Sequence, residues 1–253
     1  MTPNQCREGC AAAGICAVIP TYNNARTIIA VVTDVRQYVS DIFVINDGST
    51  DGTAGLLEKI EGITLITHPV NLGKGAALKN GFSAAYHKGF KAAITIDSDA
   101  QHYPSDIPLF LSAYTRHPGA IIVGARNMSK DGIPARSSFG NAFSNFWLYV
   151  QTGCRLPDTQ SGFRIYPLNT VAPITLFSYR FEFEIEILVR SAWRGAPLMS
   201  IPIQVHYEPK ETRVTHFRPI IDFLRISALN TILTLIGVFI QLPRRLLRRL
   251  YAA

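Results

Sequence analysis

The sequence predicts an α/β fold with a largely parallel central sheet and helices on both of its faces. Short apolar runs typical of buried strands alternate with helix-length segments, and four such strand–helix units follow one another in the first half. The chain has 253 residues, 47% of them hydrophobic and 17% charged, which is enough for a full core and excludes a disordered chain. We expect one domain over residues 15–217, between an N-terminal extension (residues 1–14) and a tail (residues 218–253).

Strands are expected where runs of Ile, Val, Phe and Ala lie between turn residues. These runs occupy residues 15–20, 41–47, 63–67, 91–97 and 120–124. Helices are expected between them, at residues 24–39, 50–60, 74–88 and 105–117. Asp51 lies near the start of the second helix, and Pro108 lies in the first turn of the fourth. Ala77, Leu78 and Phe82 belong to one apolar stripe of the third helix.

The second half is less regular. A polar loop is expected at residues 128–137, followed by an aromatic-rich helix at residues 139–153. A short strand at residues 162–166, a helix at residues 180–194 and an edge strand at residues 198–207 complete the predicted domain.

The tail predicts contact with a membrane. Residues 226–242 carry no charge, Pro243 follows them, and four arginines in two pairs come next. At about 1.5 Å per residue the uncharged stretch reaches roughly 26 Å, which is short of a hydrocarbon core of about 30 Å. A single crossing from a cytoplasmic domain would also place the arginines outside. We therefore expect an interfacial or re-entrant helix held by arginine–phospholipid contacts; the alternative is a buried helix packed on the domain.

The net charge of +7 is concentrated in the same region. After residue 203 the chain has eight basic and three acidic residues, so the remainder is nearly neutral. This distribution indicates a local basic patch and argues against a protein that coats nucleic acid. The four cysteines form no zinc-binding pattern, and no signal peptide is evident, so we expect a reduced, intracellular chain.

Polar segments follow the first, second and fourth predicted strands, at residues 20–24, 46–51 and 97–102. Because ligands bind at the carboxyl ends of strands in an open parallel sheet, we expect these segments to form one site. Asp97 and Asp99 point to the same side of an extended backbone, with Gln101 next in phase. Such oxygen donors suit a divalent cation that holds a diphosphate. The alternative is that Asp97 and Asp99 only cap a helix or lie in solvent. Asp47, at the end of the neighbouring strand, disfavours this alternative.

Two common nucleotide-binding motifs are excluded. The segment around Lys74, which opens a helix between two glycines, lacks the Ser or Thr of a P-loop and the third glycine of a dinucleotide fingerprint. Arg126 and Arg136 are candidates for an anion pocket, or are ordinary surface arginines. His102 adjoins the acidic cluster and is a candidate ligand, or has a capping or core role.

Five motifs together resemble family 2 glycosyltransferases, and within them the dolichyl- or polyprenyl-phosphate mannosyl- and glucosyltransferases. They are Pro20-x-Tyr22-Asn23, Val44-x-Asn46-Asp47-Gly-Ser-x-Asp51-Gly, Asn71-x-Gly73-Lys-Gly75, Asp97-x-Asp99-x-Gln101-His102 and Gly124-x-Arg126. The resemblance covers residues 15 to about 217. It implies a GT-A fold, an inverting transfer from a nucleotide sugar, and Mg²⁺ or Mn²⁺ as cofactor.

The resemblance also implies roles for particular residues. For the nucleotide sugar we expect Pro20, Tyr22, Asn24, Asp47, Lys74, Asp97, Ser98, Asp99, Gln101, Arg126 and Arg213. Asp99 and Gln101 would hold the metal. Arg126, Arg136 and Arg164 are candidates for an acceptor phosphate. The segment from Arg213 to Arg218 loosely matches the family's flexible acceptor or diphosphate loop.

Two departures from the family pattern bear on the substrates. Asn24 stands where the family often has Glu, which weakens one nucleoside contact and indicates a different base. No clear base motif is present for deprotonating a sugar hydroxyl, although Asp158 stands near that place. Because a phosphate acceptor is already an anion and needs no such base, this absence favours a lipid phosphate.

The sequence therefore predicts an inverting, metal-dependent glycosyltransferase that moves a hexose from a GDP- or UDP-sugar to a polyprenyl or dolichyl phosphate. We expect it at the cytoplasmic face of the cell membrane, as a peripheral or monotopic protein without a nucleic-acid partner. The alternative is a family 2 enzyme that glycosylates a sugar hydroxyl, with Asp158 as its base.

Two further readings are disfavoured. A sugar-nucleotide pyrophosphorylase would need a glycine-rich loop with Arg and Lys after the first strand, and residues 20–24 have neither. A non-catalytic nucleotide-sugar binder would not need the intact acidic cluster.

Overall fold

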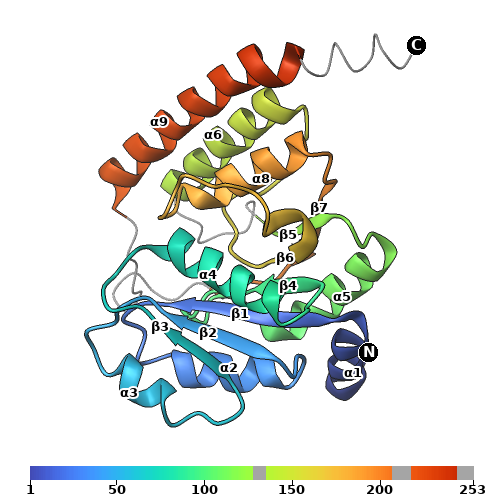
Figure 1. The fold of residues 1–253 in the computed structure, drawn as a ribbon, viewed down its shortest axis with the longest axis vertical. Helices are drawn as coiled ribbons and strands as arrows, with labels where there is room; N and C mark the ends of the chain where they lie inside the picture. The colour runs from blue at the N-terminus through green and yellow to red at the C-terminus, as the bar shows by residue number, and fades with distance from the viewer. Residues whose placement is uncertain (128–134, 207–217, 244–253) are drawn as a thin grey trace.

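A computed structural model describes residues 1–127, 135–206 and 218–243 (Figure 1). Its sheet has the strand order β3-β2-β1-β4-β6-β5-β7. The strands are β1 (Ile15–Thr21), β2 (Ile42–Asn46), β3 (Thr64–Thr67), β4 (Ala92–Thr95), β5 (Ile121–Arg126), β6 (Arg164–Pro167) and β7 (Leu198–Ile203). Strand β6 is antiparallel to both of its neighbours, whereas the other pairings are parallel. The predicted largely parallel sheet and the edge position of its last strand are confirmed.

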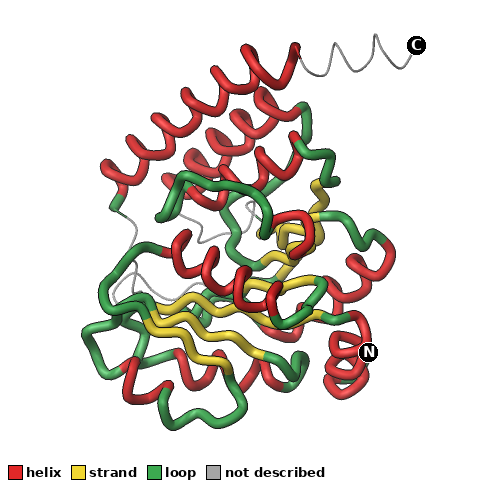
Figure 2. Tube along the Cα trace, viewed as in Figure 1, coloured by secondary structure: helices red, strands yellow, loops and turns green. Residues whose placement is uncertain are grey.

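Helices and turns connect the strands (Figure 2). The helices are α1 (Pro3–Ala13), α2 (Ile28–Arg36), α3 (Thr53–Leu57), α4 (Lys74–His87), α5 (Ile107–Arg116), α6 (Ala135–Thr152), α7 (Leu168–Val171), α8 (Phe183–Trp193) and α9 (Pro219–Ile236). Helix α4 begins where the sequence predicted. Helix α6 begins earlier than expected, within the segment assigned to a polar loop, and residues 128–134 of that loop lie outside the described part.

Two apolar cores lie on opposite faces of the sheet. One contains Val31 and Val35 of α2 and Phe110 of α5. The other contains Phe82 of α4 and Phe183 of α8, together with residues of α6, α7 and α9. Figure 1 shows α2 and α3 on one side of the sheet and α4 on the other, with α6, α8 and α9 stacked beyond it. The helices thus cover both faces, as the strand–helix alternation predicts.

The segment before β1 is helical. Thr2 and Gln5 form a capping box at the start of α1, and Gly14 ends the helix in a left-handed conformation with φ 68°. Cys6 and Cys10 of α1 are fully buried in the core that α5 also lines. These thiols therefore act as small apolar side chains.

The C-terminal helix is longer than the uncharged stretch suggests. Helix α9 continues through a π-helical turn, Gly237–Gln241, and the most apolar 18-residue window within the 22 residues Ile220–Gln241 has a mean hydropathy of 1.9. At about 1.5 Å per residue this helix measures roughly 33 Å, so with the residues before the uncharged stretch it is long enough to cross a bilayer. Only 17% of its most apolar window is buried in the structure.

Candidate active site

A cavity of about 570 Å³ lies at the carboxyl ends of β1, β2 and β4. Its lining consists of Pro20, Thr21, Tyr22, Asn24, Asp47, Asn71, Gly73, Lys74, Ala77, Asp97, Ser98, Asp99, Gln101, Arg180, Phe181 and Arg218. Nine of the residues expected to bind the nucleotide sugar are among them. Arg126 is not in the lining, and Arg213 lies outside the described residues. The strand-end segments therefore meet as the parallel topology requires.

The loops after β1 and β4 are tied together by side chains. The Nδ2 atom of Asn24 donates to Ser98 Oγ at 2.8 Å and to the carbonyl of Tyr22 at 3.2 Å. The hydroxyl of Thr27 donates to the carbonyl of Ser98 at 2.6 Å. Asn24 thus has a structural role in addition to its place in the cavity wall.

Asp47 organises the loops after β2 and β3. One of its oxygens accepts from His68 Nδ1 at 2.7 Å and from the amide of Leu72 at 2.9 Å. The other accepts from the amide of Gly73 at 2.8 Å. The side chain is buried, and Asn80 donates to the remaining nitrogen of His68. Asp47 therefore shapes the cavity wall even before any ligand binds.

Lys74, in the cavity wall, joins two carboxylates. Its Nζ atom lies 2.7 Å from Asp97 Oδ1 and 2.8 Å from Glu184 Oε1. Burial opposes the charge, but the two carboxylates hold the pKa of Lys74 above its usual value. Burial also acts against the charge of Asp97, whose pKa is nevertheless lowered by Lys74. A Cβ atom on Gly162 would lie 2.4 Å from Asp97 Oδ2, so this glycine permits the close approach.

Asp99 and Gln101 are the candidate metal ligands. One oxygen of Asp99 accepts the amide of Gln101 at 3.0 Å, across Ala100 in a left-handed conformation with φ 61°. No cluster of three or more His, Cys, Asp or Glu side chains that could hold a metal exists in residues 1–127, 135–206 and 218–243. Two oxygen donors do not make a cage, but they fit Mg²⁺ or Mn²⁺, which bind one or two carboxylates together with water and substrate phosphates.

His102 is buried beside the acidic segment and packs against the core. Burial lowers the pKa of His102 to about 4, so its ring is neutral at physiological pH. The ring packs 5.4 Å from that of Phe163, and its Nδ1 atom has no hydrogen-bond partner.

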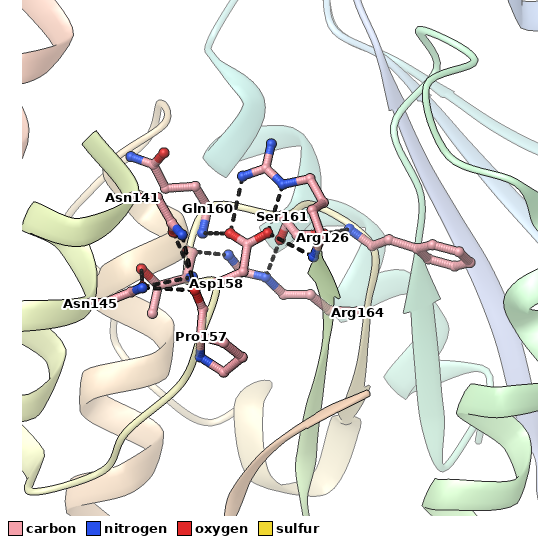
Figure 3. A network of polar contacts seen from close by, with 10 residues as sticks. Arg126, Asn141, Asn145, Pro157, Asp158, Gln160, Ser161 and Arg164 are labelled. Atoms are coloured by element: carbon pink, nitrogen blue, oxygen red, sulfur yellow. Dashed lines mark hydrogen bonds and ion pairs between the residues drawn. The ribbon is translucent and has the colours of Figure 1, made fainter. Parts of the chain in front are cut away.

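Arg126 and Asp158 form a two-point ion pair (Figure 3). Arg126 donates through Nε to Asp158 Oδ2 at 2.6 Å and through a terminal nitrogen to Oδ1 at 3.0 Å. Asp158 also accepts the amides of Arg126 and Gln160 and is fully buried. Burial alone would raise the pKa of Asp158, but the Arg126 guanidinium lowers it below its usual range. A carboxylate in this state is a weak base.

Two other arginines, Arg164 and Arg136, were also expected at the acceptor phosphate. Arg164 is fully buried and donates to the carbonyls of Ser161, Thr159 and Glu184 and to the hydroxyl of Tyr166. It therefore cannot reach an acceptor phosphate, and that expectation is wrong. Arg136 belongs to α6, but its side chain lies outside the described part of the structure.

The wall formed by Arg180 and Phe181 was missed by sequence reasoning. The loop that carries them is fixed by Glu186, which accepts the amides of Phe177 and Ser178. The carbonyl of Tyr179 accepts the amide of Ala76 in the first turn of α4. The contact between Tyr179 and Ala76 joins segments about a hundred residues apart, so no local pattern reveals it.

The fold and the cavity at the strand ends can now be compared with those of known proteins. The sequence model of glycosyl transferase family 2 matches residues 16–188. The chain belongs to this family, and it is therefore a glycosyltransferase.

Several relatives share most of the chain. It is 26% identical over 212 residues to the UDP-N-acetylglucosamine–dolichyl-phosphate N-acetylglucosaminyltransferase of Methanococcus voltae, which covers 75% of this chain and 84% of that one. It is 23% identical to the undecaprenyl-phosphate mannosyltransferase of Micrococcus luteus, over 75% of this chain and 82% of that one.

Solved structures show the same fold. Glucosyl-3-phosphoglycerate synthase from Mycobacterium tuberculosis, crystallised with Mn²⁺, UDP and phosphoglyceric acid, superposes with a TM-score of 0.68 at 19% identity. The match covers 94% of this chain and 83% of that one. The predicted GT-A fold is therefore confirmed.

Proposed function

We propose that the protein transfers a hexose, with inversion, from a GDP- or UDP-sugar to a polyprenyl or dolichyl phosphate at the cytoplasmic face of the cell membrane. The observation that carries this proposal is the state of the carboxylates. Of those in the cavity lining, Asp47 already accepts three hydrogen bonds and Asp97 is paired with Lys74. Asp99, the third, is the candidate metal ligand, and Asp158 is buried against Arg126.

A lipid-phosphate acceptor suits such a site. A phosphate oxygen attacks the anomeric carbon while the bond from that carbon to the diphosphate oxygen breaks on the opposite face. The nucleophile is already an anion, so no proton has to be removed. The named activities of the relatives from Methanococcus voltae and Micrococcus luteus support the same acceptor class.

We assign the nucleoside to Pro20, Tyr22 and Asn24, and the ribose and diphosphate to the segment from Asp97 to Asp99. Asp99 and Gln101 would hold Mg²⁺ or Mn²⁺, which stabilises the charge of the departing nucleoside diphosphate when it is bound. Lys74 acts on the donor indirectly, by fixing Asp97.

We assign the acceptor phosphate to Arg126 and Arg136. The ion pair with Asp158 fixes the plane of the Arg126 guanidinium and thereby makes Asp158 a positioning residue. Arg213 remains a proposed contact of the diphosphate or acceptor. The apolar tail would keep this part of the site at the membrane surface.

The alternative, transfer to a sugar hydroxyl, needs a general base. Asp158 was its candidate, and its lowered pKa and complete burial disfavour that role. A substrate-assisted or Asp99-dependent base would be required instead.

The deciding experiment is turnover of a panel of GDP- and UDP-sugars with Mn²⁺, with and without a polyprenyl phosphate in detergent. We expect nucleoside diphosphate release only with the lipid phosphate, together with a chloroform-soluble glycolipid. Metal-dependent donor binding without any lipid product would contradict the proposed acceptor and move it to a sugar hydroxyl.

Asp99→Ala should lower kcat by at least about a hundredfold, because it removes the proposed metal ligand without touching the core. The circular dichroism spectrum and the melting temperature should stay close to those of the wild type. Retained turnover in the folded variant would overturn the metal assignment.

A further inference from the structure

Helix α9 presents an apolar face to its surroundings. The residues of its inner face recur at helical spacing, and they include the buried Asp222, Leu229, Asn230 and Leu233. The opposite face exposes large apolar side chains over the whole length of the helix: Ile220, Leu224, Leu235 and Phe239 are between 52% and 77% exposed. Within the described residues 219–243 the charged residues are Asp222 and Arg225, which form an ion pair at 3.5 Å, so the apolar face itself is free of charge. A surface helix bathed in water usually carries its charges there.

Helix α6 has a second exposed apolar stripe, which the sequence analysis did not identify. Phe139, Phe146 and Val150 recur at helical spacing and are 66%, 57% and 46% exposed. Tyr149 belongs to the same stripe, and the guanidinium of Arg155 stacks 4.5 Å from the centre of its ring. An aromatic ring beside an arginine is typical of side chains at the headgroup level of a membrane.

The two stripes meet through aromatic side chains. The ring of Phe143, on α6, lies 6.5 Å from that of Phe139 and 5.2 Å from that of Phe223 on α9. Both Phe139 and Phe223 are exposed. Figure 1 shows α9 lying along α6 at the end of the molecule remote from α2 and α3. The stripes therefore form one surface, which we call the α6–α9 surface, and contiguous apolar patches of this kind mark interaction sites.

Polar contacts hold α9 against α6. The Nε2 atom of Gln151 lies within hydrogen-bond distance of the carbonyl of Asn230, at 3.1 Å, and of Thr234 Oγ1, at 3.2 Å. Both amide side chains are buried, and Leu233 is fully buried in the core that α8 shares. A crossing orientation would strip α9 from this core and leave Asn230 in hydrocarbon without Gln151, which is costly.

We infer that the α6–α9 surface docks on an anionic phospholipid bilayer, with α9 lying along one leaflet and not crossing it. The inference rests on the proposed function, because a lipid-phosphate acceptor resides in a bilayer. Charge complementarity favours this occupant: Arg155 and Arg225 flank the surface, and the sequence adds Arg244, Arg245 and two further arginines. Arg218 both lines the cavity and directly precedes α9, so docking brings the cavity next to the lipid headgroups.

The test is flotation of the full-length protein with vesicles of phosphatidylcholine alone or mixed equally with phosphatidylglycerol. We expect binding to the mixed vesicles, and a loss of about tenfold for Val150→Glu, because a charge replaces an apolar contact with lipid. Leu109→Glu is the matched control: Leu109 on α5 is 46% exposed, as Val150 is, but lies in a helix that packs on the other core. It should bind like the wild type.

If the Val150→Glu variant floats like the wild type, α6 does not contact the membrane and the inference is wrong for this helix. A wild-type dimer that Val150→Glu dissociates, with no vesicle binding, would assign the surface to a second copy and overturn the inference. Melting temperatures establish that each variant is folded. Flotation needs no donor or acceptor, so its result is independent of catalysis. Transfer in detergent without flotation would contradict the membrane-docking inference. Flotation without transfer would contradict the proposed function.

A labelling experiment separates the flat orientation from a crossing one. Glu58→Cys and Ala253→Cys are introduced singly into a Cys154→Ser background, and membrane vesicles with the cytoplasmic side outward are treated with an impermeant maleimide. We expect both positions to react without detergent. Reaction at position 58 alone, with position 253 requiring detergent, would show that the helix crosses.

Discussion

The chemical role of Asp158 depends on a single partner, Arg126. From the sequence it was the candidate base for a sugar-hydroxyl acceptor. The structure places it against Arg126, with two side-chain hydrogen bonds and complete burial. A carboxylate that is ionised and fully engaged orients its partner and does not remove protons.

Replacing Asp158 with Asn should therefore destabilise the protein by about 3 kcal/mol, because it leaves a largely buried guanidinium without its counter-charge. The measurement is urea-induced unfolding at neutral pH. The pKa of Asp158 is lower in the folded state than in the unfolded one, so the stability it contributes is present above its ordinary pKa and declines as the pH falls through the lowered one. The difference between wild type and variant should shrink accordingly in acid.

An Asn variant that keeps the stability of the wild type would contradict this role of the ion pair. Arg126→Gln provides the matching variant from the other side of the pair. In a double variant the two losses of stability should not add, since both remove the same interaction.

At the scale of elements, the start of α4 depends on contacts with α8 and the loop before it. The sequence places Lys74 between two glycines but does not explain them. A Cβ atom on Gly75 would lie 2.6 Å from Phe183 Cβ and 2.8 Å from the carbonyl carbon of Tyr179. Gly73 adopts a φ of 105°, which other residues rarely adopt. The glycines thus let the Arg180 loop approach the cavity.

Gly75→Ala should lower the stability by about 2 kcal/mol, because backbone and ring atoms must shift to admit the methyl group. Gly55→Ala is the control, since nothing lies within 4 Å of its added Cβ in helix α3. That change should be neutral or stabilise by up to about 1 kcal/mol. Thermal unfolding of both variants tests the pair, and equal effects would refute the packing argument.

The whole molecule brings the site together through its strand order. Strand β6, which runs antiparallel between β4 and β5, positions the segment from Asp158 to Arg164 beside Arg126. A short strand was predicted at residues 162–166, but its direction and neighbours depend on pairings with strands about forty and seventy residues away. The same order places Asp97 and Asp47 on a common edge.

Metal removal should affect activity but not the fold. In the described part of the structure no cluster of ligands holds a metal by itself, so the metal contributes little to folding without the donor. We expect EDTA to abolish transfer and added Mn²⁺ to restore it, with an unchanged melting temperature. With nucleoside diphosphate present, Mn²⁺ should raise the melting temperature, because the ligands then bind only the native state. A large drop with EDTA alone would indicate a structural metal.

Sequence by itself determined the alternation of strands and helices, the start of α4, the strand-end position of the acidic residues and the apolar character of the tail. These features follow from hydrophobic periodicity and turn chemistry, which act over a few residues. Tertiary structure decided how the charges are paired: Lys74 lies between Asp97 and Glu184, Asp158 is paired with Arg126, and Arg164 donates to backbone carbonyls. It also decided that α9 packs on α6, since ion pairs and helix contacts form between segments that only the folded chain brings together.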